Sequence, residues 1–314
     1  MNKTMKNYKN NTENKKEFKL LDPKNDVVFQ MLFGKNNLAK GLLENILPDD
    51  ITSLRVDVNK QLLGNTPKDK IGIVDLRAVI NEEIECEVEM QMFYFKNFIP
   101  RFLDYWAKLY SGQLKQGDAY ELLHKAVSIA IINQNIPNLK GLQAHTIWHI
   151  REDRNYEKIL TNNLELHIIE VQKVKEEYKN NKDDKLLQWI MFLLNPESEE
   201  VDNIMVKNKK IEEAKKELLS LSQNEENQRI ADFRERDLRD KIDMYETGID
   251  IGLAEGKEKG IKVGKEEGIK EGILKEKNRT IISLLKMKAP IDKIMEITQA
   301  TKDEIEKIKK DESL

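Results

Sequence analysis

One short stretch of the chain, EIECEVEMQM at residues 83–92, alternates acceptor side chains with mostly apolar ones. The acceptors after its first residue are Glu85, Glu87, Glu89 and Gln91. This period of two predicts a strand with one polar face and one apolar face. Carboxylates on one strand face repel one another, so the pattern indicates a need for positive charge nearby.

A further carboxylate, Asp75, lies in the preceding apolar stretch KIGIVDLRAVI at residues 70–80. Residues 81–82 form a weak turn, and the two stretches are therefore predicted to pair as a β-hairpin. Counting back from that turn places Asp75 roughly opposite Glu87 or Glu89. Side chains opposite each other on adjacent strands lie about 5 Å apart at their Cβ atoms, so these carboxylates are expected to share one site.

Two kinds of cation could offset these carboxylates. A hard divalent ion with oxygen ligands, Mg²⁺ or Mn²⁺, is the usual solution where carboxylates gather. Arg77, two residues from Asp75 and on the same face, is the competing solution. In that case the strand face is solvated and carries cross-strand Arg–Glu pairs. The spacing leaves both open, and Glu87 is interpreted as a solvent or salt-bridge residue.

The elements that must position these side chains follow from hydrophobic periodicity. Helical spacing begins at Asp26, which is predicted to be the N-cap, and Gly34 is a possible interruption. The predicted order is a helix at 26–46, strands at 51–58, 70–80 and 83–92, an amphipathic helix at 93–116, an interior strand at 126–132, and further strands at 146–150 and 164–171. Such an order predicts a compact α/β unit.

After residue 180, charged helical sequence replaces the strand patterns. The chain has 314 residues, which is room for about two domains. The final segment is predicted to hold three short helices, the second opened by Pro290 and the third capped by Thr301. The predicted divisions are a disordered basic tail at 1–19, an α/β domain at 20–180, a helical region at 181–247, a glycine-periodic helix at 248–277 and a small helical segment at 278–314.

Glycine occupies every fourth position of the stretch GIDIGLAEGKEKGIKVGKEEGIKEG at residues 248–272. Each glycine costs a helix roughly 0.8–1 kcal/mol relative to alanine, so the array costs on the order of 6 kcal/mol. A period of four matches a right-handed helix crossing in which backbones touch. We therefore expect a homo-oligomer, with a frayed helix or flexible arm as the alternative. The glycines are Gly248, Gly252, Gly256, Gly260, Gly264, Gly268 and Gly272.

The bulk composition excludes several classes of protein. The net charge is -3, so no overall basic field indicates nucleic acid, and any such site must be local. The only cysteine, Cys86, cannot form a disulfide within the chain and favours a reducing compartment. No apolar run approaches the about 18 residues of a membrane span, and the start has no secretory apolar core. A cytoplasmic protein without a membrane partner is expected.

The histidines do not predict a metal site. His145 and His149 are four residues apart, which suits zinc on a helix. The stretch TIWHI is more typical of a strand, however, and the sequence offers no third ligand nearby. Structural or surface roles are therefore predicted.

Several stretches, in this order and spacing, resemble the recombination-promoting nuclease (Rpn) family, also described as PD-(D/E)XK nuclease-family transposases. The resemblance covers about residues 20 to 310. The chain has no DDE-type triad at recognisable spacing, so the transposase name does not imply that reaction. The matching stretches are LLDPKNDVVFQMLFG, VDLRAV with Asp75, VEMQM with Glu89 and Gln91, FIPRFLDYWAKLYSGQL with Arg101 and Tyr105, KKELLSLSQNEENQRIADFRERDLRD, the glycine array and the final I-x-x-I-T segment.

This resemblance implies a fold and a reaction. The fold is a PD-(D/E)XK restriction-endonuclease-like α/β core, a mixed sheet flanked by helices, followed by a mostly α-helical C-terminal region. The reaction is metal-dependent cleavage of DNA, with Mg²⁺ or Mn²⁺ as cofactor. By resemblance, Asp75 and Glu89 bind the ion and the backbone carbonyl of Met90 completes the protein ligands. Gln91 occupies the position of the nuclease lysine and completes the catalytic set.

The chain departs from the family in its charges. Gln91 can orient water through its amide but brings no positive charge. Arg101 and Arg77 are candidates to supply that charge and to bind phosphate. Gln30 stands where the family commonly has lysine. Glu44 is a further candidate for the outer metal shell, or a residue of a solvated helix face.

Two other functions stay open on the sequence. The neutral Gln91 and the net charge of -3 also suit a weak or inactive nuclease fold that acts as a DNA-binding or regulatory module. The third possibility is a helical scaffold whose N-terminal unit only supports assembly.

Overall fold

The computed structural model describes residues 19–58, 61–62, 72–73, 75–94 and 96–312. The predicted disordered tail therefore lies almost entirely outside the described residues, as do parts of the predicted strand at 70–80. The chain forms two compact units, Met1–Asp237 and Leu238–Leu314. Among the described residues, no helix is long and apolar enough to cross a membrane.

The first unit is built on a mixed six-stranded sheet, with strand order β1-β4-β5-β6-β8-β7. Antiparallel pairing joins β1, β4 and β5, parallel pairing joins β5, β6 and β8, and β7 is antiparallel to β8. A separate two-stranded sheet pairs β2 with β3. The strands are β1 (Leu54–Val58), β2 (Gln61–Leu62), β3 (Gly72–Ile73), β4 (Leu76–Ile80), β5 (Ile84–Gln91), β6 (Lys125–Ile132), β7 (His145–Trp148) and β8 (Leu164–Glu170).

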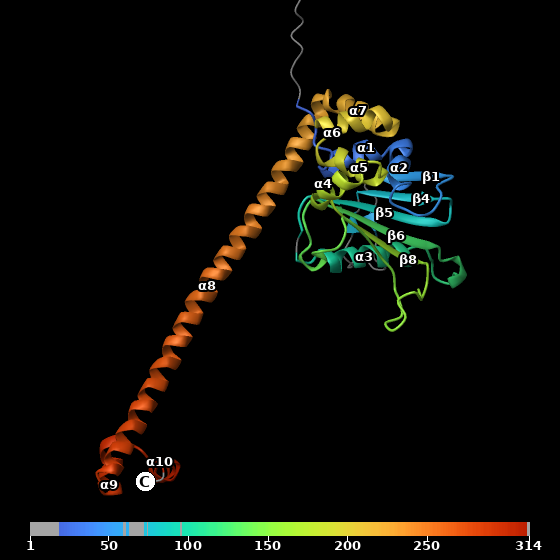
Figure 1. Cartoon of the computed structure of the whole chain (residues 1–314). Coiled ribbons are helices and arrows are strands. Elements are labelled where there is room, and N and C mark those ends of the chain that lie inside the picture. The colour runs from blue at the N-terminus through green and yellow to red at the C-terminus, as the bar shows by residue number, and fades with distance from the viewer. Residues whose placement is uncertain (1–18, 59–60, 63–71, 74, 95, 313–314) are drawn as a thin grey trace, which may run out of the picture. The chain divides into compact units, whose positions relative to one another are not determined.

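Helices cover both faces of this sheet (Figure 1). The helix α3 packs on β5 and β6 from one face, and the remaining helices of the first unit lie on the other. The predicted fold, a mixed sheet flanked by helices and followed by a helical C-terminal region, is confirmed. The helices up to residue 222 are α1 (Asp26–Phe33), α2 (Asn36–Leu43), α3 (Phe98–Ser111), α4 (Val171–Asn180), α5 (Lys185–Leu194), α6 (Glu199–Lys207) and α7 (Lys209–Ser222), with 3₁₀ turns at Tyr120–Leu122 and Pro137–Leu139.

The central strands are buried on both faces. Every residue of β8 and all but the first of β6 are buried, as continuous apolar runs in parallel strands require. β5 lies between β4 and β6 and is also covered on both sides, although one of its faces carries carboxylates. The polar face of β5 is therefore not a solvated one.

The predicted helix at 26–46 is two helices, α1 and α2, which separate at Gly34. A Cβ atom at Gly34 would lie 2.7 Å from the Gln30 carbonyl oxygen and 3.0 Å from a methyl of Val58, so the break packs tightly against β1. The predicted cap was wrong by one residue. Asn25 is the N-cap, and its side chain accepts hydrogen bonds from the backbone N–H groups of Val27 and Val28.

The helices α5 to α7 belong to the same hydrophobic core as the sheet. Trp189 of α5 is 1% exposed and packs between Phe33 and Phe192, with ring centroids 5.8 and 6.2 Å away. The chain before α1 is also tied to the end of α7, because the backbone N–H of Leu21 donates to Ser222 Oγ at 3.0 Å. The first unit therefore depends on residues well beyond the last strand.

The helix α8 (Glu225–Lys286) runs for 62 residues, and in the second unit it is followed by α9 (Ile291–Thr298) and α10 (Lys302–Asp311). The end of α8 forms a small core with these two helices through four buried side chains. Pro290 is the N-cap of α9, and Thr301 caps α10 through a capping box with Glu304, so both predicted helix starts are confirmed. The buried side chains are Ile281, Ile294, Ala300 and Ile305.

Replacing Trp189 tests whether α5 belongs to the core of the first unit. We expect Trp189→Ala to lower the free energy of unfolding by about 3–5 kcal/mol, because it leaves a large cavity. Urea denaturation followed by circular dichroism measures this loss. Tyr120, which is 82% exposed, is the aromatic control, and Tyr120→Ala should change stability by less than about 0.5 kcal/mol. Equal effects of the two changes would contradict this assignment.

Candidate functional site

The hairpin of β4 and β5 brings Asp75 and Glu89 together. Its register pairs Leu76 with Val88 and Arg77 with Glu87. Asp75 immediately precedes β4, so the same register continued by one residue places it opposite Glu89. Of the two sequence alternatives for the partner of Asp75, the structure selects Glu89.

The Asp75 carboxylate lies at the end of the ladder and is 8% exposed. Its Oδ2 accepts the backbone N–H of Met90 at 2.7 Å, and its Oδ1 accepts the side-chain amide of Gln30 at 3.1 Å. The pKa of Asp75 is raised to about 7, chiefly by burial and to a smaller extent by nearby Asp26, while both hydrogen bonds oppose the rise. The two hydrogen bonds fix the position of the carboxyl group but do not offset the cost of burying its negative charge.

The Glu89 carboxylate is 5% exposed and only partly satisfied. Its Oε1 accepts the Gln91 amide at 2.7 Å and lies 3.4 Å from Arg101 Nη2. Its Oε2 is buried without a hydrogen-bond partner among the described residues. The pKa of Glu89 is raised to about 7, chiefly by burial; the charge of Arg101 opposes this rise and that of Asp75 adds to it. Glu89 therefore keeps one oxygen available for a cation.

Arg101 supplies positive charge from α3. Its Nη2 donates to Gln91 Oε1 at 2.8 Å, so the Gln91 amide connects the guanidinium of Arg101 to the carboxylate of Glu89. The guanidinium lies 5.8 Å from the ring centroid of Tyr105, one helical turn away, in a cation–π contact. The predicted Arg101, Gln91 and Glu89 thus lie in one hydrogen-bonded group.

Arg77 has a different partner. Its Nε and Nη2 donate to Glu85 Oε2 at 3.0 and 2.9 Å. This is the cross-strand Arg–Glu pair that was weighed against a divalent ion, and its hydrogen bonds go to Glu85. Asp75 and Glu89 are left without that charge.

The interpretation of Glu87 as a solvent or salt-bridge residue was wrong. Glu87 is 1% exposed, and its Oε1 accepts the hydroxyl of Ser128 on β6 at 2.6 Å. Its Oε2 has no partner among the described residues, and burial raises its pKa to about 8. The signal that could have found this contact is Ser128 itself, a lone hydroxyl in the apolar interior stretch AVSIAII.

The helical contact to Asp75 comes from Gln30 of α1 rather than from Glu44. Glu44 is the C-cap of α2, where it is exposed and lies 3.4 Å from Lys40. Its place in an outer metal shell stays a prediction, and the observed contact favours the alternative of a solvated helix face. Sequence reasoning noted Gln30 only as a departure from the family lysine.

A second polar cluster joins the histidines that the sequence set aside. His145 of β7 contacts His167 at 2.8 Å between ring nitrogens, and Glu165 lies 2.8 Å from His167 and 3.2 Å from His149. Lys125 also reaches Glu165, at 3.2 Å. The contacts follow one another in a chain, and no three His, Cys, Asp or Glu side chains in the described ranges are arranged to hold a metal ion. The cluster ties β7 to β8 and β6.

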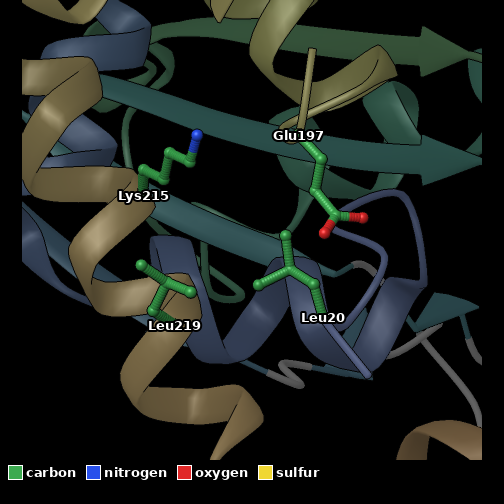
Figure 2. A pocket seen from close by; sticks show the side chains of 4 residues that line it. All are labelled: Leu20, Glu197, Lys215 and Leu219. Carbon is green, nitrogen blue, oxygen red and sulfur yellow. The ribbon is translucent and has the colours of Figure 1, made fainter. Parts of the chain in front are cut away.

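A surface hollow lies away from these residues. Figure 2 shows Lys215 and Leu219 of α7 facing Leu20, from the segment before α1, and Glu197, from the turn before α6. Lys215 is already paired with Asp202 at 2.6 Å. None of the predicted site residues lines this hollow, so the candidate site is the group of buried carboxylates on the sheet.

A family model, described as PD-(D/E)XK nuclease family transposase, matches residues 23–248. The chain belongs to this family. The match includes Asp75, Glu89 and Arg101 and ends at the first glycine of the array. No curated protein and no solved structure matches the chain. Membership identifies a nuclease fold and implies DNA as the substrate class, and nucleases of this kind typically use divalent metal ions.

The donor set of this site suits a divalent cation. Asp75, Glu87 and Glu89 present carboxylate oxygens, which hard divalent ions prefer. Within the part of the chain that the structure describes, two of these oxygens, Glu87 Oε2 and Glu89 Oε2, are buried and unpartnered, and Arg101 is bonded to Glu89. Each of these carboxyl groups has a raised pKa, which means that the nearby positive charges and hydrogen bonds do not offset the cost of burying its negative charge.

The raised pKa of Glu87 makes stability depend on pH. A carboxyl group with a folded-state pKa above its unfolded value of about 4.5 contributes stability that is lost as pH rises through the folded value, here about 8. In a metal chelator, we expect the free energy of unfolding to fall from pH 5 to pH 8. The slope should be shallower in Glu87→Gln, by up to about 1.4 kcal/mol per pH unit.

Urea denaturation of both proteins in EDTA, at intervals of one pH unit, measures this difference. Glu85→Gln, at the neighbouring position that pairs with Arg77, is the control. Identical slopes for Glu87→Gln and the unmodified chain would contradict a buried, protonated Glu87.

Proposed function

We propose that the protein is an endodeoxyribonuclease that depends on Mg²⁺ or Mn²⁺ and acts in the cytoplasm. The observation that carries this proposal is the placement of Asp75 beside Glu89, whose Oε2 is buried and unpartnered among the described residues. Both residues lie within the part of the chain that matches the nuclease family. The fold, the family and the donor set support the same reaction.

In this reaction, Asp75, Glu89 and the backbone carbonyl of Met90 are the groups that would hold the ion. A bound divalent cation lowers the pKa of a coordinated water and offsets charge on phosphate. The backbone of Met90 is fixed because its N–H donates to Asp75. Hydrogen bonds from one side chain to the next therefore set the orientation of the ligands.

Gln91 and Arg101 divide the work of the nuclease lysine. A lysine would both orient water and supply positive charge, and Gln91 can do only the first. The guanidinium of Arg101, which is bonded to Gln91 and partly exposed, supplies the charge for a DNA phosphate. Arg77 is a weaker candidate for phosphate, because its guanidinium is paired with Glu85.

A weak or inactive nuclease fold that binds DNA is the second candidate. The observation in its favour is that the Gln91 amide is bonded on both sides, to Glu89 and to Arg101, which leaves less freedom to orient water. Calorimetry with Mg²⁺ separates the two functions. Equal binding by the unmodified chain and Glu89→Ala would favour the second.

Cleavage of plasmid DNA tests the nuclease directly. The purified protein should nick or cut plasmid in Mg²⁺ and should lose this activity in EDTA. Asp75→Ala should lower the rate by about 100-fold or more, because even residues that only support a metal ligand contribute 10–100-fold. Glu83→Gln, an exposed carboxyl on the same hairpin, is the control. Cleavage that survives Asp75→Ala in a folded protein would overturn the site.

We also propose that the glycine array of α8 associates with a second copy of the chain. A Cβ atom built on any glycine of the array meets nothing within 4 Å, and apolar side chains such as Leu253 and Ile261 beside them are exposed. Charge favours an antiparallel partner. Residues 240–255 carry five acidic and one basic side chain, whereas residues 273–288 carry five basic and one acidic. An antiparallel pair centred on Gly264 places these segments opposite each other.

Leucine at Gly256, Gly260 and Gly264 should abolish this association, because the side chains prevent close backbone contact, although leucine favours the helix itself. Light scattering coupled to gel filtration gives the mass. Leucine at Glu258, Lys262 and Glu266, which have the same spacing two positions away, is the matched control and should keep the oligomer. An oligomer that persists with leucine at the three glycines would contradict the proposal.

A further inference from the structure

The segment that joins β6 to β7, residues 133–143, carries no acidic side chain. Its sequence, NQNIPNLKGLQ, holds five amide side chains and one lysine. The segment that follows β5, residues 92–103, also lacks acidic residues and contains Lys96 and Arg101. The chain has 56 acidic residues in 314, so two segments of this combined length would hold about four at the average share. Because the net charge of the chain is -3, a DNA site requires a local region of this kind.

Both segments lie at the carboxyl ends of the parallel strands, beside the candidate site. The backbone N–H of Asn133 donates to the carbonyl of Gln91 at 2.8 Å, and the side chain of Gln134 accepts the backbone N–H of Tyr94 at 2.7 Å. In open α/β sheets, ligands bind outside the carboxyl ends of the strands. The segment 133–143 therefore begins at the edge of the site that holds Gln91.

Contacts from the end of β8 and from α4 hold this segment in place. Glu170 Oε1 accepts the backbone N–H of Ile136 at 2.6 Å, and Lys173 Nζ donates to the carbonyl of Leu139 at 2.8 Å. Ile136 and Leu139 are buried, so the apolar residues of the segment anchor it in the fold. The carboxylate of Glu170 is itself paired with Lys173, which offsets its negative charge.

The remaining polar side chains of the segment are exposed. Among the described residues, the side chains of Asn135, Asn138 and Lys140 have no hydrogen bond or ion pair. Amide groups both donate and accept hydrogen bonds, and a lysine ammonium binds phosphate as a point charge. A backbone that is already fixed loses little conformational entropy when its side chains bind a ligand. The segment therefore offers unused donors, on a fixed backbone, to a ligand that is rich in acceptors.

We propose that the segment between β6 and β7 binds the sugar–phosphate backbone of DNA. Lys140 contacts a phosphate, and the amides of Asn135 and Asn138 donate to neighbouring backbone oxygens. This inference rests on the proposed function, because it takes DNA as the substrate. It adds the direction in which the DNA leaves the site, across the carboxyl ends of β6 and β8.

The spacing of the strands suits this direction. Neighbouring strands lie about 4.8 Å apart, so β8 lies about 10 Å from β5 in the order β5-β6-β8. Phosphates of one strand of B-DNA follow one another about every 3.4 Å along the helix axis. The segment therefore reaches about three nucleotides from the site on β5.

Binding of a fluorescein-labelled DNA duplex to the full chain, measured by fluorescence anisotropy in EDTA at several salt concentrations, tests this inference. Lys140→Gln should weaken binding and reduce the slope of log affinity against log salt by about 0.9, because one phosphate contact is lost. The combined change of Asn135→Ala and Asn138→Ala should weaken binding about tenfold, as expected for two lost hydrogen bonds. It should leave the slope unchanged, because amides carry no charge.

Lys158 and Asn155 provide the matched controls. Both are exposed and precede β8, at the amino end of that strand. Lys158→Gln removes the same charge as Lys140→Gln, and Asn155→Ala removes an amide of the same kind. Both should leave the affinity within about twofold of that of the unmodified chain and the salt dependence unchanged. A thermal melt verifies that each variant is folded.

A salt dependence and affinity of Lys140→Gln that match those of Lys158→Gln would overturn the inference. Plasmid cleavage in Mg²⁺ separates this failure from failure of the proposed function. If the unmodified chain cuts plasmid and Lys140→Gln binds DNA like its control, the nuclease stands and the segment has no part in it. If the chain binds DNA through Lys140 but cuts no plasmid, the inference stands and the proposed reaction is wrong. If the unmodified chain neither binds nor cuts DNA, both proposals are wrong.

Discussion

Carboxylates that are buried together repel one another unless a cation lies among them, and this constraint acts at the centre of the sheet. Asp75, Glu87 and Glu89 are all nine-tenths buried or more, and the guanidinium of Arg101 lies 3.4 Å from Glu89. The pKa of each carboxyl is raised to about 7 or 8, chiefly by burial. Ionising these groups near neutral pH therefore costs free energy in the folded protein. A divalent ion held by these carboxylates, as proposed above, would offset that cost and would displace the protons they carry.

The rest of the first unit supports this arrangement. The antiparallel register of β4 and β5 places Asp75 opposite Glu89, and the parallel neighbour β6 brings Ser128 to Glu87. The helix α3, which follows the hairpin in the sequence, covers its acidic face and carries Arg101. The helix α1, which precedes the hairpin, carries Gln30, whose amide donates to Asp75. Elements separated by up to about a hundred residues thus meet at one end of a hairpin, where their side chains donate hydrogen bonds to the carboxylates.

The sequence predicted local features well and remote contacts poorly. Alternation along residues 83–92 was enough to predict β5 and its acidic face, and the turn at 81–82 narrowed the partner of Asp75 to two residues. The same alternation misled the interpretation of Glu87, because a period of two indicates two different faces but not whether a distant helix covers the polar one. The contacts of Gln30 with Asp75 and of His145 with His167 were not predicted for the same reason, because each joins residues that lie 22 or more positions apart in the sequence. The functional roles of the site residues, unlike their placement, stay predictions.

Proton release on cation binding tests the central claim most directly. If a divalent ion replaces protons on buried carboxyls, calorimetry of Mg²⁺ binding in buffers of different ionisation enthalpy should detect protons released at pH 7. The release should disappear by about pH 9, where carboxyls with a pKa of about 7 or 8 are already ionised. Binding at pH 7 with no proton release would contradict an ion held by these buried carboxylates.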